Sequence, residues 1–242
     1  MELNKTHARF ETTSWTLVRE VSVGGERCER AAAELMRRYW PAVYAYLRGS
    51  GMRRDEAEEA TQGFFTDVVL ARGLIERADP DRGRLRTFIL TSLKRYLVDQ
   101  YRRVRARGGG RVASIEAFDR EEDAWGASSL EGVQAFDRRW AVAQLEEAIR
   151  RCESHFLSNG KAGHWEAFED RVYRPAVVGS TPSPLAELAP RCGFRTPADA
   201  AAAVQVVKKR ALTLLREVVA ESVADPSEIE REYRDTLTLL RT

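Results

Sequence analysis

Apolar residues recur at helical spacing in the first third of this chain. In residues 31–47 the apolar positions are Leu35, Tyr39, Val43 and Leu47, which predicts a helix that Pro41 kinks or breaks. A second helix is predicted over residues 54–72. Its first half is acidic, as suits a helix amino terminus, and its apolar face holds Ala57, Ala60, Phe64, Phe65, Val68 and Val69.

A third helix is predicted over residues 85–105, where three glycines at 108–110 end the pattern. Its inner face holds Leu85, Phe88, Ile89, Leu93, Tyr96, Leu97 and Val104. Three amphipathic helices of this length can bury their apolar faces against one another. We therefore expect one compact bundle in the first half of the chain.

Helical spacing resumes in the second half, over residues 138–156 and 165–173, with the latter ending before Pro175. A short helix over 185–191, a turn at 192–194 and a helix over 197–222 follow, the last one capped by Thr196. A helix, a glycine-containing turn and a longer helix form the helix-turn-helix pattern. The amphipathic tail from 226 to 242 predicts a final helix packed on this second unit.

Composition agrees with a helical, globular protein of one or two domains. Of the 242 residues, 43% are hydrophobic and 31% are charged. No apolar segment opens the chain, and no run approaches the ~20 apolar residues of a membrane span, so we expect neither a signal peptide nor a span. Three widely spaced cysteines fit a reducing compartment, so the expected location is the cytoplasm.

Basic and acidic residues are concentrated in different segments of the chain. Residues 82–111 carry ten cations and one acid, with Phe88, Tyr96 and Tyr101 interleaved. Residues 112–170 then carry thirteen acids against six cations, and residues 171–224 carry eight cations against four acids. Cations with interleaved aromatic rings suit nucleic acid, because they bind phosphates while the rings stack on unpaired bases. A solvated basic helix end is the alternative interpretation of the same pattern.

These patterns predict an all-α protein of two helical domains joined by an acidic flexible linker. The expected parts are an amino-terminal extension at 1–24, a first domain at 25–110, the acidic linker at 111–136, a second domain at 137–224, and a helical tail at 225–242. Two nucleic-acid modules on one tether can bind two sites with a raised effective concentration.

Motifs for catalysis or metal binding are missing from the sequence. Ligand-type side chains gather at Cys152, His155, His164, Glu166 and Glu169, but they do not make a closed zinc pattern. No glycine-rich phosphate loop, nucleophile elbow or His-Glu-x-x-His motif occurs. We therefore expect no enzyme activity, no catalytic residue, no metal and no cofactor.

Specific segments of the first half resemble a known family. Residues 54–65, 79–88 and 99–103 are similar to region two of bacterial RNA polymerase sigma factors of the extracytoplasmic-function type. The opening Phe10–Trp15 is similar to a divergent branch of that family, as are Trp165–Phe168 and Leu185–Glu217 in the second half. The resemblance covers most of the chain and is more specific in the first half.

The resemblance implies a transcription initiation factor that binds core RNA polymerase and promoter DNA. The expected polymerase-binding residues, which would dock on the clamp helices of the β′ subunit, are Asp55, Glu56, Glu58, Glu59 and Gln62. The expected DNA-binding residues are Arg84, Arg86, Lys94, Arg95, Tyr96, Tyr101, Arg102, Arg103, Arg105 and Arg107, with Gln205, Lys208, Lys209 and Arg210 in the second domain. The β flap of polymerase and an anti-sigma factor or other regulator are further partners that the family raises.

Some positions depart from the family pattern. Gly63 stands where an acid is usual, Ala60 where a larger aliphatic residue is usual, and Arg95 where many members have Asn. The second helix of the helix-turn-helix begins with an alanine run, which can touch thymine methyl groups but cannot make bidentate base contacts. Two alternatives therefore stay open: a sigma-derived DNA-binding regulator without initiation activity, and a helical protein-interaction adaptor.

Overall fold

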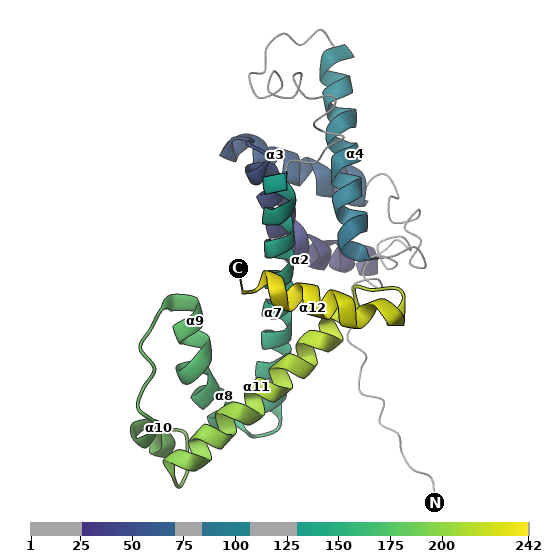
Figure 1. Ribbon diagram of the computed structural model, residues 1–242. Helices are drawn as coiled ribbons and strands as arrows, with labels where there is room; N and C mark the ends of the chain where they lie inside the picture. The colour runs from purple at the N-terminus through teal and green to yellow at the C-terminus, as the bar shows by residue number, and fades with distance from the viewer. Residues whose placement is uncertain (1–25, 71–83, 107–129, 242) are drawn as a thin grey trace, which may run out of the picture. The chain divides into compact units, whose positions relative to one another are not determined.

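The computed structural model describes residues 26–70, 84–106 and 130–241, and every regular element within these ranges is helical (Figure 1). The predicted all-α class is thus confirmed for the part that the structure describes. The chain divides into two compact units. Unit 1 comprises residues 1–143 and 219–242, and unit 2 comprises residues 144–218.

Unit 1 is built around three helices, α2 (Glu26–Gly49), α3 (Arg54–Gly63) and α4 (Leu85–Ala106). Their apolar faces meet in one core that includes Tyr39, Leu47, Phe64, Leu93 and Leu97. The α2 helix runs on through Pro41 without ending there, so the predicted break does not occur. The bundle predicted from the apolar spacing is present, and the predicted basic helix over 85–105 matches α4 closely.

The second predicted helix differs in its last two turns. The α-helix ends at Gly63, and a π-helix, η1 (Phe64–Leu70), continues the chain. A π-helix widens the turn and shifts the angular position of each following side chain. Phe64 and Phe65 both become buried, and their rings meet edge to face with centroids 5.3 Å apart.

The first turns of α7 (Leu130–Ser158) belong to the core of unit 1. The Trp140 ring stacks on Tyr39 with centroids 4.5 Å apart and on Phe136 with centroids 5.9 Å apart. Residues 130–136 are therefore helical and partly buried, whereas the sequence placed them in the acidic linker. The remainder of the predicted linker, at 111–129, lies outside the described residues, as does the extension at 1–24.

The carboxy-terminal segment also belongs to unit 1. It consists of η4 (Pro226–Glu228) and α12 (Ile229–Leu239). The final helix was expected on the second unit, and that prediction is wrong. Hydrogen bonding explains the difference, because the Leu85 N–H donates to the Ser222 carbonyl at 3.0 Å and Glu232 accepts from Arg84.

Unit 2 contains the rest of α7, α8 (Ala162–Phe168), the π-helix η3 (Glu169–Tyr173), α9 (Arg174–Val178), α10 (Leu185–Arg191) and α11 (Pro197–Ala220). Ala167, Leu188 and Val204 form a core cluster there. Pro175 was expected to end a helix, but it lies in the first turn of α9, where a missing N–H costs nothing. Among the described helices, none combines the length and apolar character needed to cross a membrane.

Candidate protein and nucleic-acid interfaces

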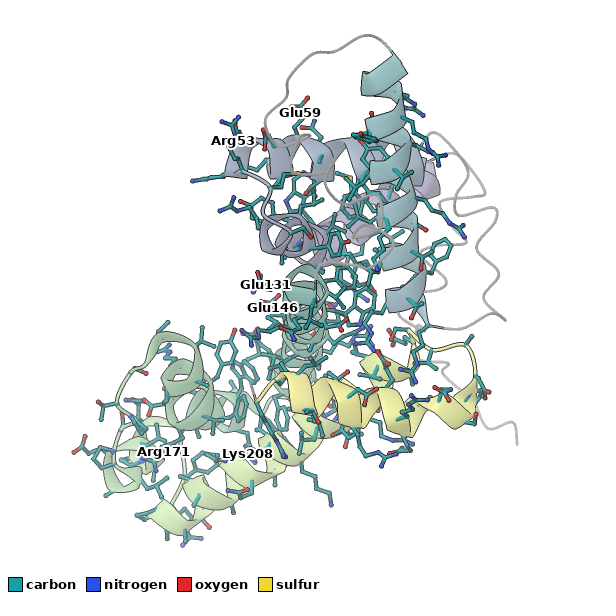
Figure 2. The ribbon with its side chains drawn as sticks, turned by 45° about the horizontal axis from the view of Figure 1, so that its top comes forward. Arg53, Glu59, Glu131, Glu146, Arg171 and Lys208 are labelled. Carbon is teal, nitrogen blue, oxygen red and sulfur yellow. The ribbon has the colours of Figure 1, made fainter. Side chains whose placement is uncertain are left out.

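The acidic residues of α3 face solvent, where a partner could reach them. Asp55, Glu58, Glu59 and Gln62 are exposed, and Glu56 is half-buried. Figure 2 shows Glu59 pointing away from the helix bundle. Ala57 and Thr61 lie on the opposite, buried face, so the helix separates its acids from its core contacts. We call the five residues Asp55, Glu56, Glu58, Glu59 and Gln62 the α3 surface.

Two arginines hold the beginning of this surface in place. Arg53 pairs with Glu56 at 3.2 Å, and its own N–H donates to the same carboxylate at 3.2 Å. Arg54 pairs with Glu58 at 3.0 Å, one helical turn away. Both arginines and Glu58 are well exposed, Glu56 is half-buried, and ion pairs at the surface contribute only about 0–1 kcal/mol each. They orient the carboxylates more than they stabilise the helix.

A pocket of about 550 Å³ opens beside the α3 surface. Its lining consists of Trp40 and Tyr44 from α2 and Arg54, Glu58 and Gln62 from α3. Trp40 is half-buried, with its ring stacked on Phe65 at a centroid distance of 5.9 Å. Sequence reasoning missed Trp40 and Tyr44, although they stand four residues apart and therefore share one helix face. The pocket combines the aromatic side chains of Trp40 and Tyr44 with the Arg54–Glu58 ion pair and the Gln62 amide, so its polar wall can both donate and accept hydrogen bonds.

The carboxy-terminal half of α4 presents its predicted cations to solvent. Arg95 and Arg102 are exposed on one face, seven residues apart, while Tyr101 and Arg103 beside them are half-buried. Lys94 is also half-buried, and burial lowers the pKa of its ammonium. The Arg105 side chain and the whole of Arg107 lie outside the part that the structure describes. The exposed Arg95 and Arg102, with the half-buried Arg103 beside them, are cations of this half, and we call these three residues the α4 surface.

The beginning of α4 is different, because Arg84 just before the helix and Arg86 in its first turn are both paired with acids. Arg84 pairs with Glu228, with Glu232 at 2.7 Å and with Asp235 at 3.5 Å. Arg86 pairs with Asp137 at 3.1 Å and with Glu232 at 3.3 Å. Each arginine side chain is only 16% exposed. The phosphate contacts predicted for both residues therefore require them to exchange one anionic partner for another.

Tyr96 lies in the core rather than on the surface. Its ring is 8% exposed and meets Phe64 edge to face with centroids 5.9 Å apart. Base stacking by Tyr96, as predicted, would require the ring to leave this core. Tyr101 is the better placed of the two predicted stacking residues.

Unit 2 contains the predicted helix, turn and helix. Gly193 has φ 76° in the turn between α10 and α11, a backbone conformation that favours glycine. Thr196 caps α11 through its hydroxyl, which accepts from the Asp199 N–H at 3.1 Å and donates to the Asp199 carboxylate at 2.8 Å. The cap predicted at Thr196 is thereby confirmed.

A carboxylate of η3 fixes the entry to α10. Asp170 accepts from the Ser183 N–H and hydroxyl, each at 2.9 Å, and pairs with Arg191 at 2.6 Å. Burial raises the pKa of Asp170, but the hydrogen bonds from Arg191 and Ser183 outweigh it, so the pKa is lowered overall. Ser183 thus serves as a partner of Asp170, and Pro184 occupies the cap position of α10.

The predicted DNA contacts of α11 lie on its solvent side. Gln205, Lys208 and Lys209 are exposed, and Figure 2 shows Lys208 projecting from the helix. Arg210 is half-buried and pairs with Glu217 at 3.6 Å. The four residues therefore divide into three accessible ones and one that is already paired.

No cluster of three or more potential metal ligands occurs among the described residues. Cys152 is buried, and burial raises the pKa of its thiol to about 11. His164 instead meets the rings of Phe156 and Phe194 at centroid distances of 6.0 and 5.3 Å. These side chains are part of the packing of unit 2.

Comparisons with known proteins return no relative: neither a family model, nor a curated protein, nor a solved structure matches the chain. The surfaces themselves therefore carry the functional argument.

Proposed function

We propose that this chain is a sigma-like transcription initiation factor, which binds core RNA polymerase through the α3 surface and promoter DNA through the α4 surface. One observation carries the proposal: unit 1 presents an acidic face and a cationic face on two helices that share one core. The Tyr96–Phe64 contact lies in that core, at the junction of α4 with the π-helix that continues α3. A factor that links an enzyme to DNA needs two such surfaces held rigidly to each other.

The α3 surface supplies charge and an anchor for polymerase. Its exposed carboxylates would steer a cationic partner and fix its register. Beside them, the pocket lined by Trp40, Tyr44 and the paired Arg54 and Glu58 would receive a side chain of that partner. Pockets with aromatic walls often carry most of the energy of an interface. The resemblance to sigma factors implies that this partner is the pair of clamp helices in the β′ subunit of RNA polymerase.

The α4 surface supplies phosphate contacts and one accessible ring. Arg95, Arg102 and Arg103 would bind the backbone, and each neutralised phosphate makes the affinity more dependent on salt. Tyr101 would stack on a base in the opened strand, which is worth roughly 1–3 kcal/mol. The polymerase performs the chemistry, and this chain positions the DNA.

Unit 2 would bind DNA upstream of the opened segment. Gln205, Lys208 and Lys209 provide contacts to phosphate and sugar from α11, which position a protein without reading sequence. The alanines at the beginning of α11 would add apolar contact with thymine methyl groups. Two modules on one chain raise the effective concentration of each at its own site.

The burial of Tyr96 favours a second candidate function. With that ring in the core, the chain offers fewer aromatic side chains to hold an opened strand. A DNA-binding regulator that does not initiate transcription would need no such side chains. Polymerase binding separates the two candidates, because only an initiation factor depends on it.

The test of the α3 surface is direct binding to bacterial core RNA polymerase, measured by biolayer interferometry. Asp55→Lys/Glu59→Lys should weaken binding at least about tenfold, because it reverses two charges in the expected contact. Glu131→Lys/Glu146→Lys is the matched control, since both residues are exposed acids on α7. Figure 2 shows both control positions. Equal affinities for the two double variants, or no binding by the unaltered protein, would contradict the proposal.

A further inference from the structure

The carboxy-terminal segment brings three carboxylates onto the first turn of α4. Glu228 comes from η4, and Glu232 and Asp235 come from α12, one helical turn apart. All three lie within ion-pair distance of the Arg84 guanidinium. We call Glu228, Glu232 and Asp235 the acidic clasp.

The clasp is anchored by burial and by backbone contact. Glu232 is 2% exposed and lies between the guanidinium groups of Arg84 and Arg86. Burial raises the pKa of Glu232, although the two arginines act in the opposite direction. Val223, just before the clasp, forms an antiparallel bridge with Arg84. The segment is therefore docked on α4 and does not merely lie near it.

The two arginines differ in what else binds them. Arg86 also pairs with Asp137 of α7, so it keeps a carboxylate partner if α12 leaves. The carboxylates that pair with Arg84 in the described part of the chain all come from the clasp. Release of the clasp would thus change the surroundings of Arg84 most.

Carboxylates around a guanidinium occupy the positions that phosphate oxygens would take. Arginine binds both groups in the same planar geometry, with charge-assisted hydrogen bonds. Glu228 and Asp235 are 38% and 45% exposed, so water and incoming anions reach the outer side of the clasp. Arg84 itself is only 16% exposed, but an ion pair whose carboxylate reaches water is weaker than a fully buried one, so Glu228 and Asp235 are the clasp members that another anion can replace.

We propose that the acidic clasp is an autoinhibitory contact: its carboxylates compete with the phosphates of nucleic acid for Arg84. The inference rests on the proposed DNA binding by α4. With the clasp closed, α4 binds DNA through the α4 surface alone. With the clasp open, Arg84 adds a phosphate contact at the other end of the same helix.

Fluorescence anisotropy with a fluorescein-labelled, mixed-sequence, single-stranded DNA 20-mer tests the clasp in the full chain. Glu228→Gln/Asp235→Asn removes two partly exposed clasp charges and leaves the buried Glu232 in place. This variant should bind the DNA about five- to tenfold more tightly, with a steeper salt dependence by about one phosphate contact. Glu230→Gln/Glu146→Gln is the control, since it removes two exposed acids outside the clasp.

Arg84 itself provides the second arm. Arg84→Gln should change the DNA affinity of the otherwise unaltered chain less than about twofold, yet abolish the gain in the Glu228→Gln/Asp235→Asn background. Such coupling would identify Arg84 as the residue that the closed clasp prevents from binding DNA phosphates. A gain that survives Arg84→Gln, or that the control variant matches, would reflect net charge alone and would overturn the inference.

Hydrogen exchange on the unaltered protein gives an independent readout. Added DNA should accelerate exchange of the α12 amides, because binding opens the clasp. Unchanged exchange in α12 while the DNA is bound would overturn the inference and leave DNA binding intact. Absence of DNA binding by every variant would instead contradict the proposed DNA-binding function, and the clasp with it.

Discussion

The Tyr96 hydroxyl occupies the space that a Cβ atom on Gly63 would need. Gly63 ends α3, and Tyr96 lies in the middle of α4 with its ring against Phe64. The absence of a side chain at position 63 thus lets the two helices approach closely. The sequence shows Gly63 as a departure from the family pattern, and the structure gives that departure a packing role.

Gly63→Ala should destabilise unit 1 despite the better helix propensity of alanine. Alanine gains up to about 1 kcal/mol in propensity, but the new Cβ collides with a buried ring that has little room to move. The expected net loss in the free energy of unfolding is about 1–2 kcal/mol, measured by urea denaturation.

Tyr96→Phe supplies the control for this collision. It removes the hydroxyl that meets the new Cβ, so Gly63→Ala should cost less in the Tyr96→Phe background by about 1 kcal/mol. Additive effects of the two substitutions would show that the contact between Gly63 and Tyr96 does not govern the packing.

Trp140→Ala should strongly destabilise unit 1, although the sequence pattern placed Trp140 in the second domain. Trp140 is 1% exposed, and its ring stacks on both Tyr39 and Phe136. Truncation of a buried tryptophan typically costs about 3–5 kcal/mol. Hydrogen exchange of α2 and α4 would report the effect, and unchanged protection in both helices would contradict the assignment of Trp140 to their core.

Asp170→Asn should remove part of the acid sensitivity of unit 2. The folded-state pKa of Asp170 is below its ordinary value, so its contribution to stability is present above pH ~4 and is lost as pH falls through the lowered pKa. The variant should lose about 1–3 kcal/mol of unfolding free energy at pH 7 and less at pH 3. Urea unfolding of both proteins at the two pH values, with peptide-resolved hydrogen exchange in unit 2, is the measurement. An equal loss at both pH values would contradict the linkage.

Arg102→Glu/Arg103→Glu should weaken DNA binding and flatten its salt dependence. Each lost phosphate contact lowers the slope of log affinity against log salt by about 0.7–0.9. Arg138→Glu/Arg139→Glu is the matched control, because these two neighbouring arginines are exposed on α7. Equal slopes for the two double variants would show that the binding depends on total charge rather than on the α4 surface.

The sequence predicts the helices of unit 1 well where an apolar stripe and strong end signals agree. The limits of α4 are an example, with a turn cluster before it and glycines after it. The change from α-helix to π-helix at Phe64 could not be predicted. The sequence Gly63-Phe64-Phe65 is compatible with both types of helix. The π-helix accompanies the burial of both rings, Phe64 against Tyr96 and Phe65 on Trp40, and these contacts join residues far apart along the chain.

The accessible and the occupied arginines of α4 also look alike in the sequence. Arg84 and Arg102 both stand in one basic run, and only the fold shows that Arg84 meets an acid 148 positions away. An ion pair between distant residues produces no periodic pattern in the sequence, so the position of α12 could not be predicted from its amphipathic spacing. Its apolar face needed a partner, but the pattern did not say which unit supplied it.

The decisive test of the proposed initiation function is run-off transcription with core RNA polymerase on a pool of promoter fragments. The unaltered protein should give defined start sites, and these should be lost with Asp55→Lys/Glu59→Lys and with Arg102→Glu/Arg103→Glu. The control variants Glu131→Lys/Glu146→Lys and Arg138→Glu/Arg139→Glu should retain the same start sites. No initiation by the folded, unaltered protein with a polymerase of proven activity would contradict the account, as would initiation that both surface variants leave intact.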